Sequence, residues 1–173
     1  MAAEPTPSQT VGPYFSIGLL ESADSEVVPR DSSDAIAVEG RVLDGDGEPV
    51  SDAMVEVWQA GADGSYRPDF GWGRSGTDPE GRFSFVLRKP GRVRDGEGGL
   101  QAPHISVLVF ARGLLKPVRT RMYFPDEDCN VEDRVLSALA EADRASLIAR
   151  STDGGLEFDV RLQGDDQTTF FAV

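Results

Sequence analysis

The sequence contains only one histidine, His104, and only one cysteine, Cys129, among its 173 residues. A single chain therefore cannot form a metal site with two histidines, a zinc site made of cysteines and histidines, or an internal disulfide bond. The longest apolar runs fall short of the roughly 18 residues that a membrane span needs. The N-terminus also lacks the basic and then apolar pattern of a secretory signal. We therefore expect a cytoplasmic protein.

Basic residues are scarce as well. The chain has 17 Lys and Arg against 30 Asp and Glu, which gives a formal net charge of −13. Such a charge repels polyanions, so nucleic acid and acidic membrane surfaces are excluded as partners.

Turn-forming residues are abundant, with 19 glycines and 11 prolines, and they favour many short elements. Apolar residues alternate with polar ones in several segments, and this pattern predicts strands. The predicted strands cover residues 35–42, 53–59, 82–88, 104–110, 119–124 and 156–162, with a closing strand at 168–173. Short strands separated by regular turns predict an all-β fold, an antiparallel β-sandwich.

One segment, residues 131–150, has helical spacing of leucines. Asp143 and Arg144 interrupt its apolar stripe, so the pattern fits one long helix or two short ones equally. Residues 1–34 lack a periodic apolar pattern and predict an N-terminal arm with a loop at 21–34, followed by the β-sandwich at 35–173. Because the arm carries aromatic and apolar residues, we expect it to be fixed to this domain or to a neighbouring chain.

The residues alone indicate little chemistry. His104, at the start of an apolar strand, is typical of a hydrogen-bonded core or edge residue. The acidic run 126–128 is typical of a turn, and Cys129 is typical of a passive thiol. The chain shows no phosphate-binding loop and no nucleophile elbow.

Several segments taken together resemble the intradiol ring-cleavage dioxygenases. The resemblance runs in order along nearly the whole chain. The segments are Pro5–Tyr14, Val55–Ala60, Gly64–Tyr66, Lys89–Gly91, Ala102–Ser106, Phe110–Gly113, Arg121–Phe124 and Asp159–Gly164.

The resemblance implies a ferric iron held by two tyrosines and two histidines, and this chain departs from that set. Tyr66 and His104 match one ligand of each type, whereas the second tyrosine would fall near Val93 and the second histidine at Ser106. Residues i and i+2 of a strand project to the same face, so a His-x-His pair would present two imidazoles where His104 and Ser106 present one. We predict that this chain binds no iron and carries no catalytic residue. Tyr66 and His104 are then a hydrogen-bonded relic.

The departure is similar to that of the ligand-deficient alpha subunits in this family, which pair with catalytic beta subunits. The resemblance then implies a beta-subunit partner that holds the ferric iron, with a small aromatic acid and dioxygen as substrates. Residues matched to the alpha contribution to the substrate pocket are Thr10, Gly12, Pro13, Tyr14 and Arg112. An always-charged arginine suits a carboxylate, although an ion pair between subunits explains Arg112 equally well. A simple entry turn for Gly12 and Pro13, and interface packing for Tyr14, also remain open.

Two other functions are compatible with parts of the sequence. A stand-alone β-sandwich binding or carrier module also fits the missing ligands, but it gives no reason for the N-terminal pocket motif. A self-sufficient dioxygenase requires ligands that the sequence lacks.

Overall fold

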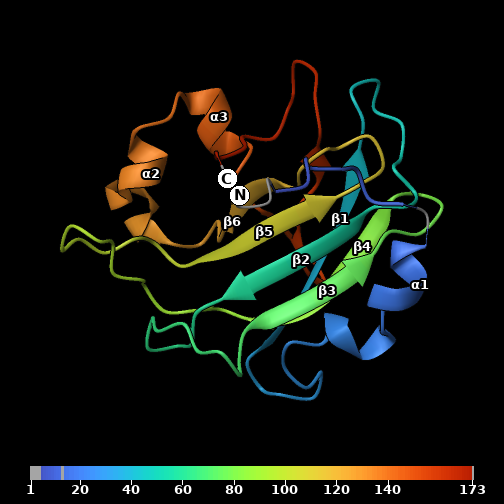
Figure 1. Ribbon diagram of the computed structural model, residues 1–173. Coiled ribbons are helices and arrows are strands. Elements are labelled where there is room, and N and C mark those ends of the chain that lie inside the picture. The colour runs from blue at the N-terminus through green and yellow to red at the C-terminus, as the bar shows by residue number, and fades with distance from the viewer. Residues whose placement is uncertain (1–4, 13, 173) are drawn as a thin grey trace.

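The computed structural model describes residues 5–12 and 14–172, and its strands form two β-sheets (Figure 1). The strands are β1 (Ala35–Leu43), β2 (Met54–Gln59), β3 (Trp72–Gly76), β4 (Arg82–Arg88), β5 (His104–Phe110), β6 (Val118–Tyr123), β7 (Arg150–Thr152), β8 (Gly155–Glu157) and β9 (Val160–Arg161). One sheet has the order β4-β1-β8-β7, with β9 also pairing with β1, and the other has the order β3-β2-β5-β6.

The core lies between the two sheets and follows the alternation in the sequence. On β5, Ile105, Val107 and Val109 are buried in the main apolar cluster, together with Phe83, Phe85 and Leu87 of β4. The opposite face of β5 carries His104 and Ser106, so alternation sends the chemistry-bearing residues away from the core. The all-β sandwich is confirmed. Its β1–β8 and β1–β9 pairings are parallel, whereas the other strand pairings are antiparallel.

The single strand that we predict at 156–162 is wrong, because it divides into β8 and β9. Both pieces keep one register on β1, with Val38 opposite Leu156 and Val42 opposite Val160. Between them, the amide of Arg41 donates to the carboxylate of Asp159 at 2.9 Å instead of to a backbone carbonyl. A side chain thus replaces one backbone acceptor, and the ladder is interrupted without a shift in register.

The helical region contains two short α-helices, α2 (Arg134–Ser137) and α3 (Glu141–Ala145), preceded by the 3-10 helix η2 (Asp128–Glu132). Asp133 caps α2, since its Oδ1 accepts hydrogen bonds from the amides of Val135 and Leu136 at 2.8 and 3.1 Å. The chain thus adopts the second of the two helical alternatives.

Both ends of the sequence differ from expectation. The arm includes a short helix, α1 (Phe15–Leu19), and the predicted loop contains the 3-10 helix η1 (Ser22–Ser25). The closing strand at 168–173 is reduced, within the described residues, to one isolated bridge between Phe171 and Arg119. Across residues 5–12 and 14–172, helices are too short or too polar to cross a membrane.

Candidate functional site

A cavity of about 380 Å³ lies on the outer face of the sheet that contains β5, and the four residues matched to iron ligands meet there. Tyr66, Val93, His104 and Ser106 all line it. The remaining lining residues are Trp58, Gln101, Arg119 and Arg121. The structure thus brings together positions that lie up to 40 residues apart in the sequence.

Glycine allows the two loops that carry Tyr66 and Val93 to approach each other. Gly64 has φ +76°, and a Cβ atom added there would lie 2.0 Å from the carbonyl oxygen of Arg92. The amide of Gly91 donates to the carbonyl of Gly61 at 2.9 Å, which ties the same loops together. The Gly64–Tyr66 and Lys89–Gly91 motifs therefore shape one wall of the cavity.

His104 is buried, with 2% of its surface exposed. Its Nδ1 lies 2.8 Å from the carbonyl oxygen of Ala102. Burial lowers the pKa of His104 to about 4, and the nearby positive charge of Arg121 acts in the same direction. The imidazole is therefore neutral at neutral pH. Because a carbonyl oxygen can only accept, Nδ1 carries the proton and Nε2 keeps its lone pair.

Tyr66 is more exposed, with 43% of its surface accessible, and its ring lies nearly perpendicular to that of Trp58 with the ring centroids 6.2 Å apart. Burial raises the pKa of Tyr66, although Arg121 and Arg119 oppose that shift. The sequence left open whether Tyr66 and His104 contact each other. Among the described residues the two side chains share the cavity but are not hydrogen-bonded to each other.

The residues of the cavity do not fit a ferric ion. The side chain of Val93 has no atom that could bind a metal, and Ser106 offers a hydroxyl group where a second imidazole would be needed. Arg119 and Arg121 add positive charge, which opposes a cation. Within residues 5–12 and 14–172, His, Cys, Asp and Glu also form no cluster of three or more that could hold a metal ion.

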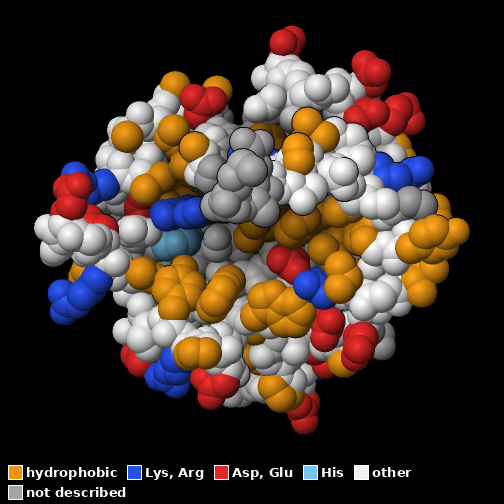
Figure 2. Space-filling view, in the orientation of Figure 1, with side chains coloured by type: hydrophobic (Ala, Val, Ile, Leu, Met, Phe, Trp, Pro, Cys, Tyr) orange, Lys and Arg blue, Asp and Glu red, His pale blue; other side chains and the backbone are white. Residues whose placement is uncertain are grey.

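Figure 2 shows how this face of the molecule is composed. The side chain of the single histidine appears beside basic side chains and next to a band of hydrophobic side chains. Trp58 and Trp72 contribute exposed apolar surface to this sheet and lie opposite each other on β2 and β3. Sequence reasoning missed Trp58, Arg119 and Arg121 as cavity residues. Their positions on β2 and β6, on the same sheet face as His104, could have identified them once the strands were paired.

Two of the residues matched to a partner's substrate pocket, Thr10 and Arg112, lie at the opposite end of β5. Thr10 Oγ1 accepts a hydrogen bond from the amide of Gly113 at 2.8 Å and donates to the carbonyl of Ala111 at 3.4 Å. This fixes the arm beside Arg112. The guanidinium of Arg112 forms an ion pair with Asp52, and 60% of its side-chain surface remains exposed.

The other arm residues make fewer contacts. Tyr14 is 78% exposed, and a Cβ atom added at Gly12 would meet no atom within 4 Å. Pro13 lies outside the described residues. The structure therefore brings Thr10 and Arg112 together and leaves Tyr14 as a projecting aromatic side chain.

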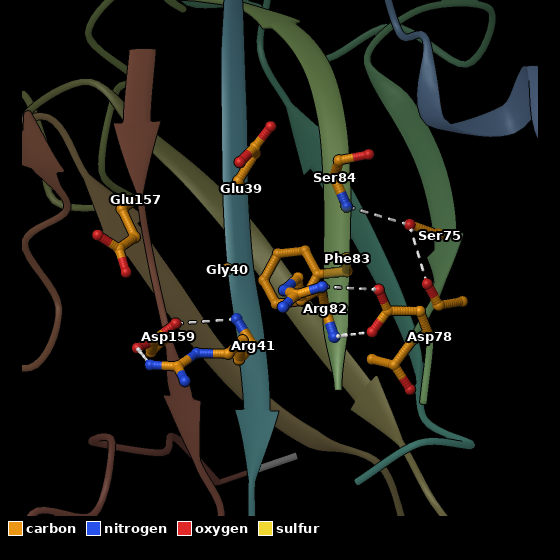
Figure 3. A pocket seen from close by; sticks show the side chains of 12 residues that line it. Glu39, Gly40, Arg41, Ser75, Asp78, Arg82, Phe83, Ser84, Glu157 and Asp159 are labelled. Atoms are coloured by element: carbon orange, nitrogen blue, oxygen red, sulfur yellow. Dashed lines mark hydrogen bonds and ion pairs between the residues drawn. The ribbon is translucent and has the colours of Figure 1, made fainter. Parts of the chain in front are cut away.

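A second cavity, of about 680 Å³, is a groove on the outer face of the other sheet that the sequence did not indicate (Figure 3). Both arginines of its lining form ion pairs with lining carboxylates. Arg41 Nη2 binds the carboxylate of Asp159 at 3.2 Å, and Arg82 lies 3.6 Å from the carboxylate of Asp78. Glu157 pairs with Arg150 outside the lining, and Glu39 belongs to none of the ion pairs among the described residues, so the groove has more carboxylates than guanidinium groups.

Comparisons with known proteins identify the family to which this fold and these motifs belong. A family model described as dioxygenase matches residues 11–164. The alpha chain of protocatechuate 3,4-dioxygenase from Burkholderia cepacia is 40% identical over 97% of this chain and 97% of its own length. This chain belongs to the intradiol ring-cleavage dioxygenase family.

A catalogued beta chain and a solved structure are also similar to this chain. The beta chain of the Burkholderia cepacia enzyme is 37% identical over 77% of this chain and 66% of its own length. Among solved structures, the dioxygenase domain of a dioxygenase and carbohydrate-binding protein fusion from Streptomyces sp. SirexAA-E matches with a TM-score of 0.63. That domain is 26% identical, and the match covers 93% of this chain and 99% of the domain.

Proposed function

We propose that this chain is the alpha subunit of a protocatechuate 3,4-dioxygenase and that it completes a substrate pocket whose ferric iron is held by a beta-type partner. The complex would open protocatechuate between its two hydroxyl-bearing carbons with dioxygen, giving 3-carboxy-cis,cis-muconate. The observation that carries this proposal is the incomplete donor set at Tyr66, Val93, His104 and Ser106, in a chain 40% identical to an alpha chain over nearly its full length. We expect the complex to be cytoplasmic.

The part played by this chain is binding and orientation. Arg112 has five N–H donors, and its pairing with Asp52 leaves donors for a second carboxylate. Its exposed guanidinium would attract and orient the carboxylate of an aromatic acid in the partner's pocket. Thr10 holds the arm beside Arg112, so that Gly12 and Tyr14 would form the neighbouring wall.

The bound ferric iron would supply the chemistry that allows the electron-rich ring of the substrate to react with dioxygen. The proposal places no step of that chemistry on this chain. A stand-alone binding or carrier module is less well supported, because a dioxygenase subunit matches the chain over nearly its whole length.

Purification of the chain alone and together with a beta-type subunit tests the proposal. We expect the chain alone to be colourless, iron-poor and inactive. We expect the co-purified complex to contain iron, to show the red colour of tyrosinate bound to ferric iron, and to cleave protocatechuate. A red and active preparation of the chain alone would overturn the proposal, and so would a beta-type complex whose activity is unchanged when this chain is removed.

A further inference from the structure

The cavity around His104 contains two arginines that lack a carboxylate partner. Most of the cations in this chain form ion pairs, but Arg119 and Arg121 belong to none of the pairs found in the described part of the chain. Other basic residues of the chain also lack an ion pair, but these two lie side by side in the lining of one cavity.

The arginines are only partly satisfied by other groups. Arg121 Nη1 donates to Gln101 Oε1 at 2.9 Å and to the hydroxyl of Tyr123 at 3.1 Å. The Nε of Arg119 is buried and has no hydrogen-bond partner among the described residues. A buried donor without an acceptor is costly, so a ligand that supplies an acceptor there gains more than it would at the surface.

Tyr123 links Arg121 to a buried carboxylate, because its hydroxyl accepts a hydrogen bond from Arg121 and donates one to Asp133 Oδ1 at 3.4 Å. Asp133 is fully buried, and its oxygens accept hydrogen bonds from the amides of Ala102, Val135 and Leu136. The cavity lining itself contains no Asp or Glu among the described residues. The positive charge of the two guanidinium groups is therefore not compensated inside the cavity.

The rest of the lining favours a flat apolar group. Trp58 and Tyr66 meet edge to face and stand at the cavity with parts of their rings exposed. Val93 adds an aliphatic contact, and the volume of about 380 Å³ is large enough for a ligand with one aromatic ring.

We propose that this cavity binds a small aromatic carboxylate, with the carboxylate on Arg119 and Arg121 and the ring against Trp58 and Tyr66. The missing donors at Val93 and Ser106 have then not left an inert relic, because the positive charge that a metal would supply is provided by guanidinium groups. The proposal concerns this chain's own cavity and does not depend on the function proposed for the complex.

Calorimetric titration of the full chain with benzoate tests the proposal, with acetate and benzamide as matched probes. Acetate keeps the charge without the ring, and benzamide keeps the ring without the charge. We expect saturable binding of benzoate, with both other probes at least about ten-fold weaker, because a charge-assisted hydrogen bond and an aromatic contact each contribute to affinity. Absence of saturable benzoate binding overturns the proposal, and acetate binding as tightly as benzoate overturns its aromatic part.

Variants locate the site. Arg119→Gln should weaken benzoate binding about ten-fold or more, because it removes the guanidinium that has the unpartnered Nε. Lys116→Gln makes the same change of charge at an exposed position outside the cavity lining and should leave the affinity unchanged. If Arg119→Gln binds benzoate like the wild type, the cavity is not the site. If a partner subunit co-purifies with the chain and binds benzoate itself, the affinity of that binding would be the same for the wild type and Arg119→Gln. The comparison of benzoate, acetate and benzamide uses the wild-type chain, so it tests the proposal even if Arg119→Gln folds poorly.

Discussion

Ser106 lies two residues after His104 on β5, and both side chains line the same cavity on the outer face of the sheet. A second imidazole at Ser106 would stand beside that of His104, because side chains two residues apart on a strand share a face. Ser106 faces Arg121 on β6 and Trp58 on β2 in the strand register. The loss of one donor is therefore a local change in a sheet that otherwise keeps its pairing.

Restoring both missing donors should restore metal binding. We expect the double variant Val93→Tyr, Ser106→His to take up ferric iron and to gain visible absorption, while each single variant stays iron-poor, because only the double variant has two phenols and two imidazoles. Metal analysis and absorption spectra measure this. Adding Arg119→Gln should raise the iron occupancy further by removing a repelling charge. A double variant that stays iron-free would show that the absent donors are not what prevents binding.

The sequence predicted the sandwich well where one face of a strand is buried. In β4, Phe83, Phe85 and Leu87 lie on the buried face, with Arg82, Ser84 and Arg88 on the other face beside the apolar Val86, and in β1 the apolar face follows the same rule. The sequence pattern did not predict the strands in which apolar and polar residues alternate weakly. β3 contains two glycines in five residues, and β7 consists of three exposed residues, so neither has an apolar face to recognise.

The division of residues 156–162 shows another limit of sequence patterns. Gly40 of β1 is placed so that an added Cβ atom would lie 1.9 Å from the carbonyl oxygen of Phe158. The close approach of the two backbones and the bond from Arg41 to Asp159 depend on strands more than a hundred residues apart. For the cavity, motifs in the sequence located Tyr66 and His104, but Arg119 and Arg121 became cavity residues only through the pairing of β5 with β6.

Arg112 is expected to act on substrate affinity. In the complex with a beta-type partner, Arg112→Ala should raise KM for protocatechuate about ten-fold and change kcat little, because it removes a charge that orients the substrate carboxylate. Steady-state kinetics measure this. Asp52→Asn is the matched control, since it removes the ion-pair partner and leaves the guanidinium in place. If Arg112→Ala leaves both constants unchanged, Arg112 has no part in the pocket.

Thr10 is expected to hold the N-terminal arm. Thr10→Val keeps the shape of the side chain but removes both hydrogen bonds to the loop after β5. We expect faster amide exchange and faster proteolysis in residues 5–12, with a loss of about 1 kcal/mol or less in global stability. Thr10→Ser keeps the hydroxyl group and should behave like the wild type. Equal proteolysis of the Val and Ser variants would mean that other contacts fix the arm.

His104 should make the protein less stable as the pH falls. Its pKa in the folded protein is about 4, mainly because of burial, and its ordinary value is 6.5. Between these values the unfolded chain binds a proton that the folded chain does not, so stability is retained above pH 6.5 and is lost as the pH falls toward 4. The loss between pH 7 and pH 5 should be about 2 kcal/mol. Urea denaturation of wild type and His104→Asn at both pH values measures it. Asparagine can keep the donor to Ala102 but cannot titrate, so the difference between the two proteins isolates the imidazole from the many carboxylates. Parallel pH profiles for the two proteins would show that the imidazole does not resist protonation in the fold.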